Sequence, residues 1–266
     1  MPKIAILSDI HANAPALEAV LREVARAKVG RVVWGGDLVG YGASSDACVS
    51  RVREMGGDCV MGNHDTYTNQ IRRDRTVLPA NRDWRKNPVW AGVEEAARTL
   101  SEENAAWLSA LPHQVEIPGG LVAHAALHQP DEWPYLRSFA DALPTLAMLR
   151  ETGSGIGFFG HTHRQEIFFD PGEPVTPERI SPTRVHLPEG VVCAVLVGSV
   201  GQPRDGDLRA GWTLWDSDTR VVEFRRTPYP ALEAAQAIVA ADLPVESALR
   251  LLDEGTARDF RRMVGL

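Results

Sequence analysis

Three observations predict an α/β fold for this chain of 266 residues. Short apolar runs are each followed by a polar turn and then by a segment with helical spacing, as in strand–turn–helix units. Several of these units follow one another from residue 3 onward. The apolar runs end in histidine, aspartate or asparagine, and the carboxyl ends of strands are where open α/β sheets bind ligands.

The first unit begins with Lys3–Ser8, which is apolar enough to form a strand covered on both faces. Asp9 and His11 follow this strand directly. The spacing over 16–25 predicts a helix, with its cap at residue 13 or 14 and a proline in the first turn. The unit therefore places an acidic residue and a histidine at the end of a buried strand.

Two further units have the same layout. Arg31–Trp34 is a strand that leads to Asp37 and to a helix over 44–55. Asp58–Met61 is the next strand, and it leads to Asn63-His64-Asp65. Because the ends of neighbouring parallel strands share one edge of a sheet, these side chains are expected to lie close together.

The segment over 67–87 shows no regular pattern and is strongly basic. It contains six Arg or Lys residues against two Asp, a net charge of +4 on a chain whose overall charge is −7. One interpretation is a lid that attracts an anionic substrate. The other is a solvated surface loop.

The remainder of the chain completes a single domain over 1–266 that ends in a helical extension at about 230–266. Two strand ends in it carry further histidines: His124, and His161 with His163. The predicted elements are helices over 89–100, 102–110 and 138–150, a hairpin over 115–117 and 120–123, strands over 156–159 and 191–197, turns and edge strands over 171–190, a loop over 198–207, a hairpin over 212–215 and 220–224, and helices over 231–241 and from 245 onward.

Composition excludes several classes of protein. The hydrophobic fraction of 44% and charged fraction of 24% are typical of a soluble globular protein, and no apolar run reaches the roughly 18 to 20 residues that span a membrane. Three cysteines without a CxxC pair, and a start without the layout of a secretory signal, favour a reducing cytoplasm. The charge of −7 argues against strong binding to nucleic acid.

The polar strand ends have the composition of a metal site. Imidazole and carboxylate ligands without thiolate suit Mn, Fe, Zn, Ni or Co. Seven candidate ligands exceed one tetrahedral site, so two divalent metal ions that share a bridging carboxylate are expected, with Asp37 as the bridge. The candidate ligands are Asp9, His11, Asp37, Asn63, His124, His161 and His163, and five of the eight histidines of the chain lie at these strand ends.

The same residues resemble the five signature blocks of the calcineurin-like metallophosphoesterases, in the family's order over residues 3 to about 165. The blocks are Asp9-x-His11, Gly36-Asp37, Gly62-Asn63-His64-Asp65, His124 and Gly160-His161-x-His163. Ser8–His11 and Gly198–Arg204 are similar to the small bacterial and archaeal phosphodiesterase branch. The resemblance implies a four-layer α/β/β/α sandwich of two mixed sheets. It places Asp9, His11 and His163 on one metal, Asn63, His124 and His161 on the other, and Asp37 between them.

The expected function is hydrolysis of a phosphodiester or a small phosphomonoester by two-metal hydroxide attack, with His64 as proton donor. Asp65 is expected either to orient His64 or to start the next helix. Asn63 and Arg204 are the expected substrate contacts, although Arg204 has Asp205 and Asp207 as alternative ion-pair partners.

Two other functions compete with this one. Protein phosphatase or dinucleoside polyphosphate hydrolase activity would use the same ligands. A metal-poor interaction scaffold would lack a ligand or His64, whereas all of these positions are filled. The oligomeric state is not predicted.

Overall fold

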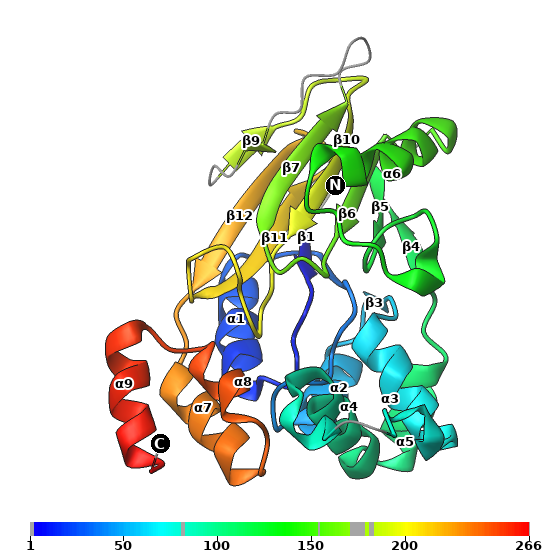
Figure 1. The fold of residues 1–266 in the computed structure, drawn as a ribbon. Helices are drawn as coiled ribbons and strands as arrows, with labels where there is room; N and C mark the ends of the chain where they lie inside the picture. The colour runs from blue at the N-terminus through cyan, green and yellow to red at the C-terminus, as the bar shows by residue number, and fades with distance from the viewer. Residues whose placement is uncertain (1–2, 81–82, 154, 171–178, 181–183, 266) are drawn as a thin grey trace.

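The protein consists of two six-stranded sheets that lie face to face, with helices on their outer sides (Figure 1). The computed structural model describes residues 3–80, 83–153, 155–170, 179–180 and 184–265. The first sheet has the order β3-β2-β1-β11-β12-β9 and the second β4-β5-β6-β10-β7-β8. The strands are β1 Ile4–Leu7, β2 Arg31–Trp34, β3 Asp58–Cys59, β4 Gln114–Ile117, β5 Gly120–Ala123, β6 Ile156–Phe159, β7 Gln165–Asp170, β8 Arg179–Ile180, β9 Arg184–His186, β10 Val192–Val197, β11 Ala210–Asp216 and β12 Val221–Thr227.

Both sheets are mixed, as predicted. In the first, β1, β2 and β3 run parallel while β11 pairs with β1 in the antiparallel sense. In the second, β5, β6 and β10 run parallel while β7 is antiparallel to β10. Of the edge strands predicted within 171–190, the structure shows β8 and β9 at the sheet ends, whereas 171–178 and 181–183 lie outside the described residues.

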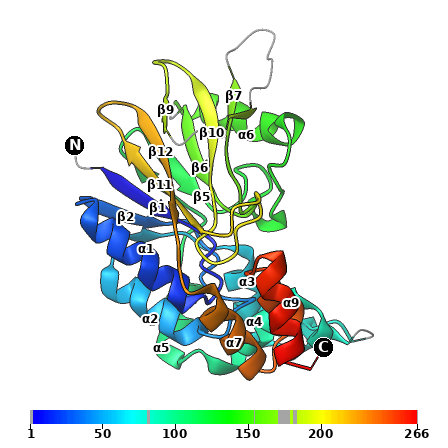
Figure 2. The ribbon, with the colours of Figure 1, turned by 90° about the vertical axis from the view of Figure 1, so that its left-hand side faces the viewer.

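Alternation along the strands creates the layers. Ile4 and Ile6 of β1 point between the sheets, whereas Ala5 and Leu7 point toward the helices on the first sheet. On the other side, α6 covers the second sheet through Leu146 and its neighbours (Figure 2). The four-layer α/β/β/α sandwich is therefore confirmed. The α-helices are α1 Ala14–Arg26, α2 Ser45–Met55, α3 Asn63–Arg73, α4 Pro88–Thr99, α5 Glu102–Ser109, α6 Phe139–Glu151, α7 Ala231–Ala240, α8 Val245–Leu249 and α9 Glu254–Met263.

The first helix begins where the polar turn after β1 ends. The Asn13 side chain accepts a hydrogen bond from the Ala16 backbone N–H at 3.1 Å, so Asn13 is the cap, and Pro15 lies in the first turn. Leu17 and Val20 on one face of α1 pack into the core against the first sheet. This docking fixes the direction in which the chain leaves Asp9 and His11.

The segment predicted as irregular over 67–87 contains regular structure, so that prediction was wrong over 67–73. Helix α3 continues to Arg73 because Ile71 is fully buried against α4, and two short 3-10 helices follow at Arg75–Val77 and Trp84–Lys86. The segment has too few apolar residues to show a helical pattern, so the continuation of α3 was not predicted from the sequence. Arg72 pairs with Glu102 and Arg75 with Glu94, so part of the positive charge is neutralised. A lid role stays a prediction.

The C-terminal helices α7, α8 and α9 form a separate apolar cluster that also includes Ala91 of α4. Helix α7 packs against α1, so the extension predicted at about 230–266 lies against the helical layer of the first sheet (Figure 2). Within the described ranges, none of the helices combines the length and the apolar character needed to cross a membrane. Cys48, Cys59 and Cys193 are free and buried.

Candidate metal centre

The predicted ligands converge where the carboxyl ends of β1, β2, β3, β5 and β6 meet. Among the described residues, three groups have ligand atoms within 4.8 Å of one another: Asp9, His11 and His163; Asp37, His124 and His161; and His11, Asp37 and His64. All of these side chains are buried. Asp37 takes part in the second and third groups, and His11 in the first and third.

Strained backbone accompanies this arrangement. Asp9, Asp37, His161 and His163 have φ values of 53°, 53°, 62° and 58°, in the left-handed region that residues with a Cβ avoid. Such a conformation costs roughly 1–2 kcal/mol per residue. Strained backbone of this kind persists only where the surrounding structure enforces it, often at functional sites. Here the left-handed conformation turns the candidate ligand side chains toward one another.

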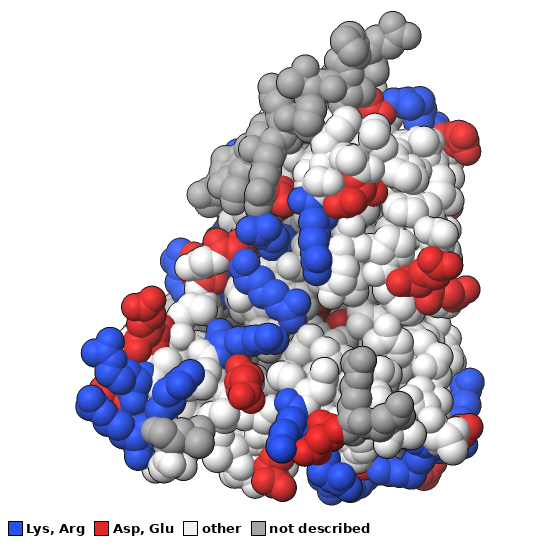
Figure 3. Space-filling model, viewed as in Figure 1, with Lys and Arg blue, Asp and Glu red and all other residues white. Residues whose placement is uncertain are grey.

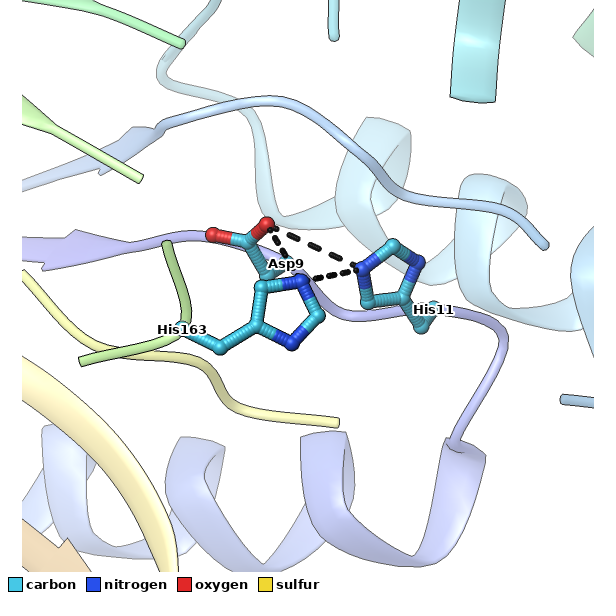
Figure 4. Close-up of side chains that lie close together, drawn as sticks. All are labelled: Asp9, His11 and His163. Atoms are coloured by element: carbon cyan, nitrogen blue, oxygen red, sulfur yellow. Dashed lines mark hydrogen bonds and ion pairs between the residues drawn. The ribbon is translucent and has the colours of Figure 1, made fainter. Parts of the chain in front are cut away.

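The first group is compact (Figure 4). His163 Nε2 lies 3.2 Å from Asp9 Oδ1, and His11 Nε2 lies 3.7 Å from the same oxygen. The two imidazole Nε2 atoms are 3.0 Å apart. His11 Nε2 also lies 3.7 Å from Asp37 Oδ2, so this group reaches the Asp37 carboxylate.

The second group is built around Asp37 and His124. His124 Nε2 lies 3.4 Å from Asp37 Oδ2 and 3.2 Å from Asn63 Oδ1. His161 completes the group within the same distance limit. The Asn63 amide oxygen therefore faces the His124 ring.

Backbone carbonyls fix the tautomers of four of the histidines. His11, His124 and His163 donate from Nδ1 to the carbonyls of Val39 (3.1 Å), Gly35 (2.7 Å) and Gln202 (2.6 Å). His161 instead donates from Nε2 to the Trp133 carbonyl at 3.0 Å. A carbonyl only accepts, so the opposite ring nitrogen of each ring that is neutral presents a lone pair to the site.

The first group therefore collects acceptors without donors. The lone pairs on His11 Nε2 and His163 Nε2 face each other beside the Asp9 carboxylate, while His124 Nε2 faces the oxygens of Asp37 and Asn63. Such a cluster is repulsive unless a cation lies within it. Ring nitrogens held by carbonyl partners on the other side are typical of metal ligands. The residues thus fit divalent metal ions.

Charges in the cluster agree with this fit. Burial lowers the pKa of His161 to about 3 and that of His163 to about 4, so both rings are neutral and able to bind metal. Burial opposes ionisation of Asp9 and Asp37, but the neighbouring histidines outweigh it and hold both pKa values below the usual range. Burial also opposes protonation of His124, yet the Asp37 carboxylate raises its pKa to about 10. A metal ion that binds His124 must therefore displace a proton from its ring.

Comparison with known proteins gives the family. The sequence profile of the calcineurin-like phosphoesterases matches residues 2–165, more than half of the chain. This chain belongs to that family. An uncharacterized protein of Methanocaldococcus jannaschii is 30% identical over 245 residues, covering 91% of this chain and 93% of the relative.

Comparison with solved structures gives the same family. The fold is similar to a metallophosphoesterase from Sphaerobacter thermophilus, with a TM-score of 0.76 and 27% identity over 94% of this chain and 98% of that one. It is also similar to a hypothetical protein from Pyrococcus horikoshii, with a TM-score of 0.75 and 17% identity over 94% and 98% of the two chains. The chain is thus a phosphoric ester hydrolase of a metal-binding family.

Asp65 of this phosphoesterase has the second of the two roles expected for it, at the start of a helix. Its carboxylate accepts hydrogen bonds from the backbone N–H groups of Asp37 (2.9 Å), Leu38 (3.0 Å) and Gly62 (3.0 Å). Both oxygens are occupied in starting α3 and in holding the loop that carries Asp37. The hydrogen bonds described for Asp65 do not include His64, so its alternative role at the helix start is the one observed.

Among the described histidines of the centre, His64 differs in that neither ring nitrogen is recorded with a carbonyl partner, and its Nδ1 is buried without a hydrogen-bond partner. Its backbone N–H donates to Asp37 Oδ1 at 2.8 Å, and its ring packs against those of His11 and Tyr41, with centroids 4.7 and 4.6 Å away. Burial keeps its pKa well below 6.5. His64 is therefore neutral and unconstrained at the edge of the ligand cluster.

Arg204 lies beside the centre. Its backbone N–H donates to the His163 carbonyl at 3.0 Å, and its guanidinium lies 5.5 Å from the Tyr41 ring centroid. The alternative partners considered from the sequence are taken, because Asp205 pairs with Arg226 and Asp207 with Arg209.

Three residues of the site were missed from the sequence. Tyr41 contacts the rings of two site histidines, and the Trp133 carbonyl fixes His161. Tyr135 stacks on the His161 ring at 3.9 Å with an angle of 20°. Tyr41 follows the Asp37 strand end by only four residues, which is a usable signal. Nothing local marks Trp133, whose role depends on a backbone carbonyl.

Proposed function

We propose that this phosphoesterase binds two divalent metal ions and hydrolyses a phosphodiester or a small phosphomonoester, with His64 as the proton donor. The observation that carries the proposal is the buried cluster of seven carboxylate, imidazole and amide side chains, in which backbone carbonyls accept the outward N–H of all four histidines. Asp9, His11 and His163 would hold one ion, Asn63, His124 and His161 the other, with Asp37 shared. Mn, Fe, Ni, Zn or Co would suit these ligands.

When bound, such ions supply a nucleophile at neutral pH and neutralise the charge of the phosphoryl group. The protein supplies the rigid frame. Carbonyl groups of Gly35, Val39, Trp133 and Gln202 orient the four histidines, and Asp65 holds the loop of Asp37. Preorganised groups of this kind need no rearrangement during the reaction, which is the basis of electrostatic catalysis.

An alkoxide leaving group requires a proton, and His64 is the buried titratable group that no hydrogen bond constrains at Nδ1. It is neutral in the free protein because burial lowers its pKa. A bound phosphate anion opposes that effect and favours the protonated ring. General acid catalysis of this kind typically contributes about 10²- to 10⁴-fold.

The test is hydrolysis of bis-p-nitrophenyl phosphate and p-nitrophenyl phosphate by metal-stripped protein to which Mn, Ni, Zn or Mg is restored singly. Turnover that returns with a metal is expected. Absence of metal-dependent turnover of either ester would refute the proposal. Comparison of His64→Ala with the wild type on an alkyl ester tests the proton donor, and an undiminished rate would remove that role.

The charge and the cysteines of the chain also bear on its substrate and its cellular location. We expect a small phosphorylated or phosphodiester substrate, and the acidic chain argues against strong binding to nucleic acid. Three free, buried thiols are consistent with the cytoplasm as the site of action.

A further inference from the structure

A groove of about 490 Å³ begins beside the metal centre. Its walls include Tyr41, Gln202, Arg204, Arg250 of the turn after α8, and Asn87–Val89 at the start of α4. Arg204, Arg250 and the wall at Gln202 lie outside the residues that the family profile matches. The groove is therefore shaped partly by the C-terminal helices of this chain.

The groove is continuous with the metal centre through shared walls. Tyr41 packs its ring against those of His11 and His64, with centroids 4.7 and 4.6 Å away. Gln202 accepts a hydrogen bond from His163 at 2.6 Å, and the Arg204 N–H donates to the His163 carbonyl. A substrate whose phosphate lies at the metals thus has its remaining part next to this groove.

The charge of the groove is opposite to that of the chain. Its lining contains two arginines and no carboxylate, although the chain carries −7 overall. Neither arginine forms an ion pair within the described residues, and the Arg204 guanidinium donates to the Gln202 amide oxygen at 2.7 Å. Burial raises the pKa of Tyr41, so its neutral phenol adds no negative charge. Figure 3 shows Lys and Arg side chains gathered beside a hollow near the middle of this face.

Arginine is well suited to phosphate because its planar guanidinium presents several N–H donors at once. We propose that the groove binds a second phosphate group of the substrate, held by Arg204 and Arg250 while the scissile phosphate lies at the metal centre. This inference rests on the proposed function and narrows its substrate class to esters with two or more phosphate groups. Those groups can be separated by a sugar, as in a phosphorylated nucleotide, or be consecutive, as in a polyphosphate chain.

Two pairs of chromogenic substrates test the inference, one for phosphate groups separated by a sugar and one for consecutive phosphate groups. Thymidine 3′-(p-nitrophenyl phosphate) is compared with its 5′-phosphorylated form, and p-nitrophenyl phosphate with the γ-p-nitrophenyl ester of ATP. Within each pair the release of p-nitrophenolate is compared, and release of ADP from the ATP ester is counted separately. We expect kcat/KM to be about 10-fold or more higher for the compound with additional phosphate in at least one pair, with the advantage falling as salt is added.

Arg250→Ala should remove most of that advantage and leave the reference esters unchanged. Arg261→Ala is the matched control, because it removes an arginine from the same C-terminal helices but outside the groove lining. Equal losses on both members of a pair, or no advantage in either pair, would overturn the groove assignment while the reference turnover stands. Failure of the reference esters with every metal would overturn the proposed function and, with it, the groove.

Discussion

Replacing Gly40 with alanine places a methyl group against the ring of His64. The added Cβ would lie 2.1 Å from His64 Nδ1 and 3.0 Å from its Cγ, far inside van der Waals contact. Gly40 also has a φ of +85°, which costs an alanine roughly 1–2 kcal/mol. Because Tyr41 and His11 pack on the same ring, His64 must rotate away from its position.

The expected loss follows from the role proposed for His64. Without a positioned proton donor, cleavage of thymidylyl-thymidine, whose leaving group is an alkoxide, should slow by about 10²- to 10⁴-fold, or about 3–5 kcal/mol in the barrier. Bis-p-nitrophenyl phosphate should change little, since p-nitrophenolate leaves without a proton. Metal content by elemental analysis should be unchanged, because the three atoms nearest to the added methyl group all belong to His64 and not to a ligand.

Gly56→Ala is the matched control for this variant. Gly56 has a φ of +66° at the end of α2, and nothing lies within 4 Å of its added Cβ, so it carries the backbone strain without the clash. Unchanged cleavage of the alkyl diester by Gly40→Ala, with its metal content intact, would refute the role of His64.

Three other predictions concern the frame of the site and the core. Asp65→Asn should lower stability by about 1–3 kcal/mol in urea unfolding and reduce metal content, since one amide oxygen replaces two that accept three N–H groups; wild-type values for both would contradict its bracing role. Tyr135→Ala should weaken metal affinity at the His161 position about 10-fold in titrations of metal-stripped protein, because the stacked ring holds that ligand; unchanged affinity would disprove the effect. Burial raises the pKa of Cys193 to about 12, so its contribution to stability is complete below an unfolded thiol's pKa of about 8.5 and is lost as pH rises toward 12. From about pH 7.5 to about pH 10.5 the wild type should therefore lose about 2–3 kcal/mol more than Cys193→Ala, and parallel losses would contradict this.

The ligands were predictable because they sit at strand ends. Alternation and turn residues locate a strand such as Ile4–Leu7, and the residues that follow it must emerge at the sheet edge. Asp9 and His11 could therefore be assigned without knowing their distance to His163, which comes from a strand of the other sheet. Asp37 could be assigned in the same way, because it follows the neighbouring strand β2.

The remaining features depend on contacts between distant parts of the chain. Helix α3 extends through 67–73 because Ile71 meets α4 with Tyr67 packed beside it, and one pair of apolar residues is too short a pattern to predict a helix. The Trp133 carbonyl that orients His161 leaves no trace in residue type. Asp65 could have oriented His64 or started a helix, and only the backbone N–H groups of the β2 loop distinguish these roles.

We expect the ligand clusters on the two sides of Asp37 each to hold a metal ion. Anomalous diffraction from crystals soaked in manganese would locate these ions. Two peaks per chain are expected, one among Asp9, His11 and His163 and the other among Asn63, His124 and His161, both next to Asp37. A single peak, or peaks only at other residues, would contradict this expectation.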